Sequence, residues 1–426
     1  MPEKPALTRR EFLNNGLAAV STAATMPVFL HHSAIALAQT GPSSQLSSRP
    51  GVPDERILVV VQLSGGNDGL NTVVPFGDDA YYRARQRLAV SAKDIIPIEQ
   101  DRGIGLHPEM SALKEMLDDG TANIIQGAGY PNPNRSHFAS MDIWHTGNTL
   151  GANGRGWLGK AIDMMPDQQN AMIAIGREAP LAGHGKQARP VSFENPGLFR
   201  WLGSDLHDAL EAPYQKINRE QWGGIADDDD DQAAFVRRTA MNAQIASDRI
   251  RQAVARPTTT SFPSGRLAMQ LRMVSNMIRA GLPTRVYYVA LGGFDTHAGQ
   301  LGRHQGLLRE FAVAVRGFYQ ELKANQLDGR VLTLAFSEFG RRVAENASRG
   351  TDHGAAGPLF MFGPMIRPGL IGQHPSLTEL DRGDLKYKVD FRSVYTAVLD
   401  QWLKCSSHMV LGKRFRPASV LNSKVV

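Results

Sequence analysis

The stretch ILVVVQLSGGNDG, Ile57 to Gly69, decides the fold of this chain. Apart from Gln62, its first seven residues are apolar and rich in β-branched side chains, which is typical of a strand covered on both faces. The Ser64–Gly69 segment that follows is rich in glycine and predicts a loop at the carboxyl end of that strand. The folded part of the 426-residue chain is therefore expected to begin at about Arg56.

Strand-like and helix-like segments alternate after this first strand. Further strands are expected at 123–126, 171–175, 285–291, 330–336 and 358–362. Helices are expected at 110–119, 136–146, 264–280 and 390–403, together with a long amphipathic helix carrying Leu307, Phe311, Val315, Phe318 and Leu322 on one side. This alternation predicts an α/β fold, a three-layer sandwich whose mostly parallel central sheet is flanked by helices.

The N-terminus is expected to be an export signal. Arg9 and Arg10 are paired, an apolar stretch runs to Leu30, and Ala36-Leu37-Ala38 has the small-x-small form that signal peptidase cuts. Residues 1–38 are therefore interpreted as a twin-arginine signal peptide, although a cytosolic N-terminal helix is the simpler alternative. The prediction implies the twin-arginine translocase as a partner during export and a periplasmic or extracellular location.

Three regions follow the predicted signal. Residues 39–55 are rich in Ser, Pro and Gly and are expected to be a linker, and residues 56–426 are expected to form one domain. Within that domain, residues 190–262 are a candidate inserted lid or subdomain. No later run is long and apolar enough to anchor the mature protein permanently in a membrane.

Composition excludes some classes of function and structure. The formal net charge is +6, without a basic stripe interleaved with aromatic residues, so nucleic acid is not an expected partner. Cys405 is the only cysteine, so the chain cannot form an intramolecular disulfide.

Polar residues gather just beyond the carboxyl ends of the expected strands, where open α/β sheets bind ligands. They are Asp68, Asp295, His297 and Glu338, and His353 follows later in the chain. Together they predict an oxygen and nitrogen ligand set for one or more divalent metals, namely zinc, manganese, magnesium or calcium. The alternative is that the aspartates are turn residues beside glycines and that His353 is a loop histidine.

Ser136 stands where a helix is expected to begin. Serine is a preferred N-cap residue, and the same position would also place its hydroxyl where helix N–H groups attract an anion. Ser136 is therefore a candidate nucleophile as well as a candidate cap, and Arg135 and Arg341 are candidates for holding the oxygens of an anionic substrate.

Five motifs carry a resemblance to a known family. They are SGGNDGLNTVVP (64–75), RSHF (135–138), GGFDTH (292–297), SEFGRR (337–342) and GTDHG (350–354). Through them the chain resembles the bacterial domain-of-unknown-function family fifteen-oh-one, whose members are typically exported by the twin-arginine pathway. That family is grouped with the alkaline phosphatase and sulfatase superfamily, so the resemblance implies an alkaline-phosphatase-like fold.

The resemblance also implies a catalytic plan, in which Asp68, Asp295 with His297, Glu338 and His353 match metal ligands and Ser136 matches the nucleophile. The sequence departs from the superfamily pattern in three ways. Its aspartate and histidine at 295 and 297 are closer together, Glu338-Phe339 replaces an Asp-His pair, and the Cys-x-Pro-x-Arg sulfatase signature is absent. One ligand is therefore missing, and the number of metals stays open.

Two functions follow from these observations. The first is an exported metal-dependent hydrolase of a phosphate or sulfate ester, which would take a small anionic ester as its substrate. The second is a non-catalytic envelope protein that keeps the fold and uses the crevice to bind a ligand or a partner.

Overall fold

The computed structural model describes residues 56–151, 154–165, 172–196 and 247–422. The main sheet of this described part has nine strands. From one edge to the other they are β11 (Gly369–Ile371), β5 (Ala122–Gly129), β10 (Gly357–Phe362), β9 (Val331–Phe336), β1 (Ile57–Ser64), β8 (Val286–Gly292), β6 (Met172–Ile175) and β7 (Val191–Phe193), and β14 (Val389–Asp390) also pairs with β5. Every pairing in the sheet is parallel except those that β10 makes with β5 and β9.

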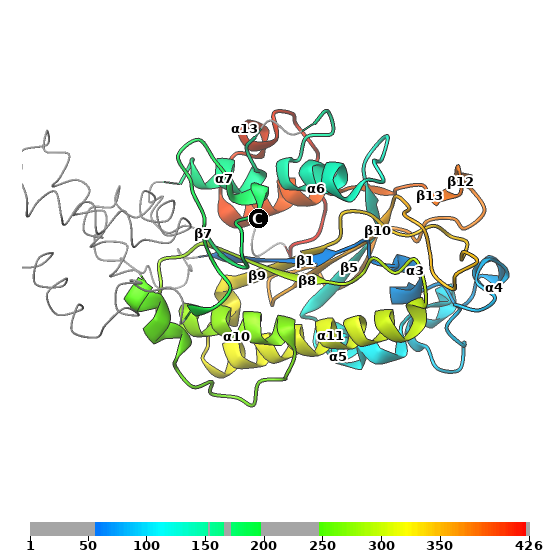
Figure 1. Ribbon diagram of the computed structural model, residues 1–426, viewed down its shortest axis with the longest axis horizontal. Coiled ribbons are helices and arrows are strands. Elements are labelled where there is room, and N and C mark those ends of the chain that lie inside the picture. Colours follow the sequence, from blue (N-terminus) through cyan, green and yellow to red (C-terminus); the bar gives the residue numbers. More distant parts are fainter. Residues whose placement is uncertain (1–55, 152–153, 166–171, 197–246, 423–426) are drawn as a thin grey trace, which may run out of the picture.

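Helices cover both faces of this sheet (Figure 1). One face carries α6 (His137–Thr146), α7 (Trp157–Ile162), α12 (Phe391–Ala397) and α13 (Ser407–Leu411), and the other carries α5 (Ser111–Asp118), α10 (Arg266–Arg279) and α11 (Gln300–Ala324). The predicted three-layer α/β sandwich with a mostly parallel sheet is confirmed.

Smaller elements lie beside the main sheet. They are α3 (Gly69–Thr72), α4 (Asp79–Ala84), the small sheet of β2 (Val73–Val74), β4 (Ile104–Leu106) and β3 (Ile96–Glu99), and the hairpin of β12 (Leu380–Asp381) and β13 (Asp384–Leu385). In Figure 1 the α3 and α4 helices and the β12–β13 hairpin lie at the same end of the molecule.

The position of β1 in the middle of the sheet explains its sequence. Successive side chains of a strand point to opposite faces, and both faces of β1 are covered. Its odd-numbered residues, 57 to 63, pack in the core beneath α10 and α11, whereas Leu58 and Val60 pack in the core beneath α6 and α12. A strand that contributes to two cores has to be apolar at nearly every position.

The expected elements agree with the structure to within a few residues, with one exception. The helix expected over 390–403 consists of α12 followed by a π-helical segment, Val398–Leu403. The helix expected from Ser136 begins one residue later, because Ser136 occupies the N-cap position of α6.

The segment 190–262 is only partly described, and its described ends belong to the main domain. At one end β7 pairs with β6, and at the other Ile250 and Ala253 pack in the core beneath α10 and α11. Residues 197–246, like the predicted signal (1–38) and linker (39–55), lie outside the described residues.

Two further expectations concern membranes and cysteine. In the portions of the chain that the structure describes, no helix combines the length and the apolar character that crossing a membrane would require. Cys405 is buried and is not part of a disulfide.

The strand order brings distant loops to one edge of the sheet. In the register of the sheet, Ser64 of β1 lies beside Gly292 of β8, and Gln62 lies beside Phe336 of β9. The loops that leave these three parallel strands therefore start at one level. Since β10 runs in the opposite direction, the loop that enters β10 also lies at this edge.

The core beneath α11 offers a test of packing. Phe311 of α11 is fully buried, and its ring lies 5.4 Å from that of Phe360 and 5.9 Å from that of Phe362, centroid to centroid. We expect Phe311→Ala to lower the free energy of unfolding by about 3–5 kcal/mol, since it removes apolar contacts and leaves a cavity. The exposed Val313→Ala on the same helix should change it by less than about 0.5 kcal/mol. Urea unfolding measures both, and equal effects would contradict this account of the core.

Candidate metal centre

A tight glycine turn lets the loops at the carboxyl edge approach each other. Gly65 and Gly66 both have positive φ angles, 118° and 79°. A Cβ atom on Gly65 would lie 2.3 Å from the backbone nitrogen of Asp295, and one on Gly66 would lie 2.4 Å from the ring of Phe339. Only glycine combines this backbone conformation with such close packing.

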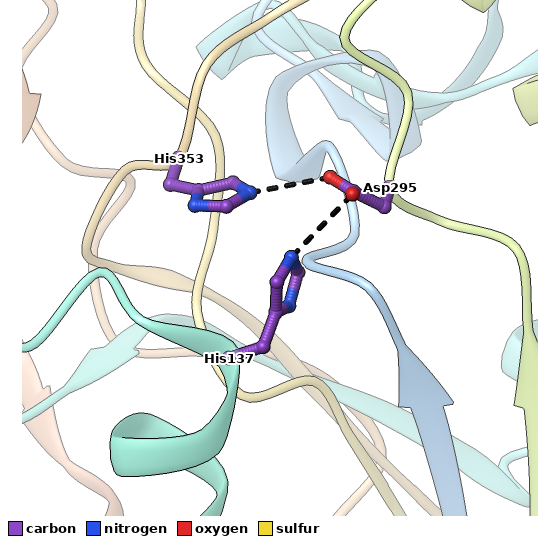
Figure 2. Close-up of side chains that lie close together, drawn as sticks. All are labelled: His137, Asp295 and His353. Atoms are coloured by element: carbon purple, nitrogen blue, oxygen red, sulfur yellow. Dashed lines mark hydrogen bonds and ion pairs between the residues drawn. The ribbon is translucent and has the colours of Figure 1, made fainter.

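Three side chains from distant segments converge at this edge (Figure 2). His137 comes from the first residue of α6, Asp295 from the loop after β8, and His353 from the loop before β10. Their ligand atoms all lie within 4.8 Å of one another. Asp295 Oδ1 is 3.2 Å from Nε2 of His353, and Asp295 Oδ2 is 3.6 Å from Nε2 of His137.

His297 adds a fourth donor beside this group. Its Nε2 lies 3.0 Å from Asp295 Oδ1 and 2.9 Å from Nε2 of His353. Asp295 and His297, which are two residues apart in the GGFDTH motif, therefore lie in contact.

The other ring nitrogen of each of these histidines has a hydrogen-bond partner. Nδ1 of His137 contacts Glu338 Oε1 at 2.8 Å, Nδ1 of His353 contacts the carbonyl oxygen of Arg135 at 2.8 Å, and Nδ1 of His297 contacts Asp352 Oδ1 at 3.2 Å. A carbonyl oxygen can only accept, so the Nδ1 of His353 carries the proton, and carboxylates favour the same tautomer in the other two.

This arrangement leaves the Nε2 lone pairs facing a common space. Two of them, on His297 and His353, are only 2.9 Å apart, and Nε2 of His137 is buried without a hydrogen-bond partner. Lone pairs so close repel unless a proton or a metal cation lies between them. Metal-bound histidines in proteins almost always donate their second ring N–H to a carboxylate or a carbonyl, as all three do here. The donor set therefore fits a divalent cation.

The charges at the site also suit a cation. Partial burial raises the pKa of Asp295, but the hydrogen bond from Arg341 and the nearby imidazole of His353 outweigh that effect and lower the pKa to about 2. Burial lowers the pKa of His353 below its usual value of 6.5, despite the nearby carboxylate of Asp295. At neutral pH the site thus offers an ionised carboxylate and a neutral imidazole, the forms that bind metals.

Arg341 is buried and holds the loops of the site together. Its guanidinium donates to the carbonyl oxygens of Gly66 at 2.7 Å, Thr351 at 2.8 Å and Phe294 at 3.0 Å, and to that of Gly65. It also donates to Asp295 Oδ1 at 2.8 Å. The sequence predicts that Arg341 binds an anionic substrate. In the structure its guanidinium donates to these carbonyl oxygens and to Asp295 instead. In this structure Arg341 positions Asp295.

Asp68 lies in a separate buried network. Its Oδ2 accepts from Arg85 at 2.5 Å and also from Gln300, and both ion-paired side chains are fully buried. Burial raises the pKa of Asp68, but Arg85 and its hydrogen bond outweigh that effect and the pKa is lowered. Asp68 was expected among the metal ligands, yet it does not belong to the cluster of His137, Asp295 and His353. Arg85 supplies the positive charge that a metal would have supplied.

Glu338 contacts His137 on the side of the ring that faces away from Asp295. It is buried, and its Oε1 accepts from the backbone N–H of Gly65 at 2.8 Å as well as from His137. The sequence places Glu338 among the ligands, and the structure places its carboxylate against the Nδ1 side of His137. It orients that imidazole rather than facing the shared space.

Ser136 and Arg135 lie next to His137 in the chain. Ser136 is exposed, and its side chain makes no capping hydrogen bond although it occupies the N-cap position. Arg135 is ion-paired with Asp384, with its Nε 2.8 Å from Asp384 Oδ2. The hydroxyl of Ser136 is therefore not committed to the cap, and Arg135 is held at the edge of the site.

Phe339 occupies the position where the superfamily pattern has a histidine. Its buried ring lies 4.9 Å from the ring of His137 and 4.6 Å from that of His353, centroid to centroid. The side chain thus packs against two of the imidazoles instead of adding a ligand.

His137 is a candidate ligand that was not predicted from the sequence. Its neighbour Ser136 was predicted instead, because serine is both a preferred N-cap residue and a possible nucleophile. The position of RSHF after the expected strand at 123–126 was the available signal, since it places His137 at the same edge of the sheet as Asp295.

Together the fold and the site define an α/β protein with a candidate metal centre at the carboxyl edge of its sheet. The chain belongs to the family described as "Protein of unknown function (DUF1501)", whose profile matches residues 55–400. No curated protein sequence matches it.

Several solved structures are similar to the chain at low identity. A protein in the alkaline phosphatase superfamily from Vibrio parahaemolyticus has a TM-score of 0.35 and 8% identity, with 84% of this chain and 73% of that chain covered. The PsFucS1 sulfatase from Pseudoalteromonas sp. has a TM-score of 0.35 and 9% identity, with 99% and 80% covered. The C-terminal periplasmic domain of EcEptC from Escherichia coli, solved in complex with Zn, has a TM-score of 0.34 and 9% identity, with 73% of both chains covered.

Metal binding is testable by stability. Adding Zn²⁺ or Mn²⁺ to chelator-treated protein should raise the free energy of unfolding, by about 2.7 kcal/mol at a hundredfold excess over the dissociation constant. His353→Ala should abolish this gain, and Glu338→Gln should weaken metal affinity by about 10- to 100-fold because it removes the partner of His137. Calorimetric titration and thermal melts measure both effects. The exposed His408→Ala serves as the control, and zinc binding by His353→Ala equal to that of the unchanged protein would exclude His353 as a ligand.

The buried network around Asp68 predicts acid sensitivity. His304 is buried there, its Nε2 lies 2.9 Å from Asn67 Oδ1, and burial lowers its pKa to about 4. An unfolded histidine titrates near 6.5, so between these values the unfolded chain binds a proton that the folded chain does not. The free energy of unfolding should fall by up to about 3 kcal/mol as the pH drops from 6.5 to 4.

Urea unfolding at several pH values between 7 and 4 measures this loss. His145 has its pKa lowered to about 4 by burial and adds a change in the same direction. His304→Gln should therefore remove only part of the dependence, and the exposed His408→Ala should leave it as it is. An unchanged slope in His304→Gln would contradict the assignment.

Proposed function

We propose that this protein is an exported, metal-dependent hydrolase of a phosphate or sulfate ester. The proposal rests above all on the three imidazoles of His137, His297 and His353, whose Nε2 atoms gather around Asp295 while their Nδ1 atoms are held by acceptors. In a metal-bound histidine one ring nitrogen binds the metal and the other donates a hydrogen bond, and these three imidazoles are arranged in that way. Export by the twin-arginine pathway remains part of the proposal and rests on residues 1–38.

The composition of the site favours zinc, with manganese as the next candidate. Imidazole nitrogens suit zinc and other transition metals, whereas magnesium and calcium prefer sites made entirely of oxygens. A divalent cation held by His137, Asp295 and His353 would act as a Lewis acid toward the anionic oxygens of an ester. The side chains of Asp295 and His297 are 47% and 44% exposed, so a substrate can reach the site from solvent.

The chain's own residues would orient the reaction. Arg341 fixes the Asp295 carboxylate, and Glu338 fixes the ring of His137, so neither has to reorganise when a substrate binds. Ser136 places an uncapped hydroxyl beside His137, at the N-terminus of α6, where backbone N–H groups favour an anion. We assign Ser136 as the nucleophile of the proposed reaction, with a water molecule as the alternative.

The rival function is a binding protein without catalysis. Two observations favour it. Among the residues that the structure describes, the hydroxyl of Ser136 makes no hydrogen bond to a histidine or carboxylate that could accept its proton, and Phe339 fills the place of a further ligand. A binding protein of this kind would hold a metal and an anion but would not turn an ester over.

Metal analysis and a substrate screen separate these functions. We expect the full chain reconstituted with zinc or manganese to hydrolyse aryl phosphates or aryl sulfates, His353→Ala to reduce the rate to background, and Ser136→Ala to reduce kcat by a factor on the order of 10³ or more. Arg309→Gln, which breaks an ion pair with Glu109 instead, is the matched control.

Each other outcome has a defined meaning. Metal binding without turnover of any phosphate or sulfate ester would support the rival, and turnover that survives Ser136→Ala would assign the attack to water. A protein that binds none of these metals would overturn the proposal.

A further inference from the structure

Two arginines beside the metal centre share one buried carboxylate. Arg135 precedes α6, Arg342 follows Arg341, and Asp384 belongs to the β12–β13 hairpin. Arg135 Nε lies 2.8 Å from Asp384 Oδ2, and Arg342 Nε lies 3.8 Å from Asp384 Oδ1. The side chain of Asp384 is 3% exposed, whereas each arginine side chain is 38% exposed. The carboxylate is thus buried beneath two guanidinium groups that reach solvent.

Both arginines are attached to the backbone that positions the histidines. The carbonyl oxygen of Arg135 accepts from Nδ1 of His353, and the backbone N–H of Arg342 donates to the carbonyl oxygen of Asp352 at 3.0 Å. Asp352 in turn contacts His297. The backbones of both arginines are therefore hydrogen-bonded to the segment that carries Asp352 and His353, and their guanidinium groups meet at Asp384.

Both guanidinium groups, which stay protonated in proteins, bind the carboxylate of Asp384, and Arg342 is close enough to Asp352 to interact electrostatically with it. Arg342 also retains unused hydrogen-bonding capacity. Its side chain makes an ion pair with Asp384 but no hydrogen bond to any residue that the structure describes, and its buried Nε and Asp384 Oδ1 both lack a hydrogen-bond partner.

Arg341, the preceding residue, differs in this respect. Arg341 is buried, and its guanidinium donates to four carbonyl oxygens and a carboxylate. A purely structural arginine is satisfied in this way. Arg342, the next residue, presents its planar donors to solvent, and an oxyanion can take up such donors in pairs.

We propose that Arg342 and Arg135, the latter positioned by Asp384, form an oxyanion subsite at the rim of the metal centre. The inference rests on the proposed function and adds a substrate class to it. The preferred ester carries a second anionic group, a carboxylate, sulfate or phosphate, besides the one at the metal. Arg342 contacts that second group, and Asp384 keeps Arg135 from closing onto the metal centre itself.

Three non-hydrolysable ligands test the subsite by equilibrium binding. Phenylphosphonate carries one anionic group. Its 3- and 4-carboxyphenyl analogues carry a carboxylate as a second anionic group, at two different distances from the phosphonate. In isothermal titration of the zinc-loaded full chain, we expect at least one carboxy analogue to bind about tenfold or more tightly than phenylphosphonate, because it gains a charge-assisted hydrogen bond.

Substitutions of Arg342 test whether this side chain causes the preference for the carboxy analogues. Arg342→Gln should remove the preference while phenylphosphonate affinity changes by less than about twofold, since one rim charge is lost and the metal ligands are untouched. Arg342→Lys should keep part of it, because the charge remains but the paired donors do not. Arg309→Gln should leave it unchanged. Metal content measured on each variant shows whether the site is still assembled.

The outcomes separate this inference from the proposed function. A preference that disappears in Arg342→Gln, in a protein that hydrolyses no ester, would support the subsite and overturn the hydrolase. Equal affinities for all three phosphonates in the unchanged protein, or a preference that survives Arg342→Gln, would overturn the subsite while leaving hydrolysis untouched.

Discussion

The guanidinium of Arg341 joins the loops on which the site is built. It donates hydrogen bonds to carbonyl oxygens in the turn after β1, in the loop after β8 and in the segment before β10. It also donates to the carboxylate of Asp295. Because a buried guanidinium is costly without partners, these loops are stabilised only in the arrangement that satisfies all of its donors. The position of Asp295, and with it the geometry of the metal centre, depends on this one side chain.

The candidate ligands are held in place by a second set of residues, which do not themselves face the shared space. Glu338, Asp352 and the carbonyl of Arg135 contact the Nδ1 atoms of the three imidazoles, and Arg341 contacts the carboxylate. Phe339 adds an apolar wall against two of the rings. Each donor is thus fixed from the side opposite the shared space, which lowers the reorganisation required when a cation binds.

Local patterns in the sequence account for most of the fold. Apolar runs such as Ile57–Leu63 require burial on both faces, and the amphipathic stripe that includes Leu307 and Phe311 requires one buried face, so both elements are predictable from period and composition. The polar residues Asp295 and His297 follow a strand in the sequence, and the structure brings them together at the common edge where parallel strands end.

The remaining features depend on tertiary contacts that no local pattern specifies. Asp68 follows β1 as a ligand would, but Arg85, seventeen positions later, pairs with it in the interior. Glu338 follows β9, yet its carboxylate meets the far side of the ring of His137. The reversed direction of β10 decides where His353 enters, and a single apolar run at 357–362 does not reveal its direction.

That reversed strand links the chemistry of the protein to the order of its assembly. Since β10 is inserted between β5 and β9, which come earlier in the chain, the segment that carries His353 takes its place beside strands made long before it. Contacts over such long sequence separations slow the folding of a domain. A chain shortened before residue 353 therefore lacks one member of the candidate ligand set, although it keeps His137 and Asp295.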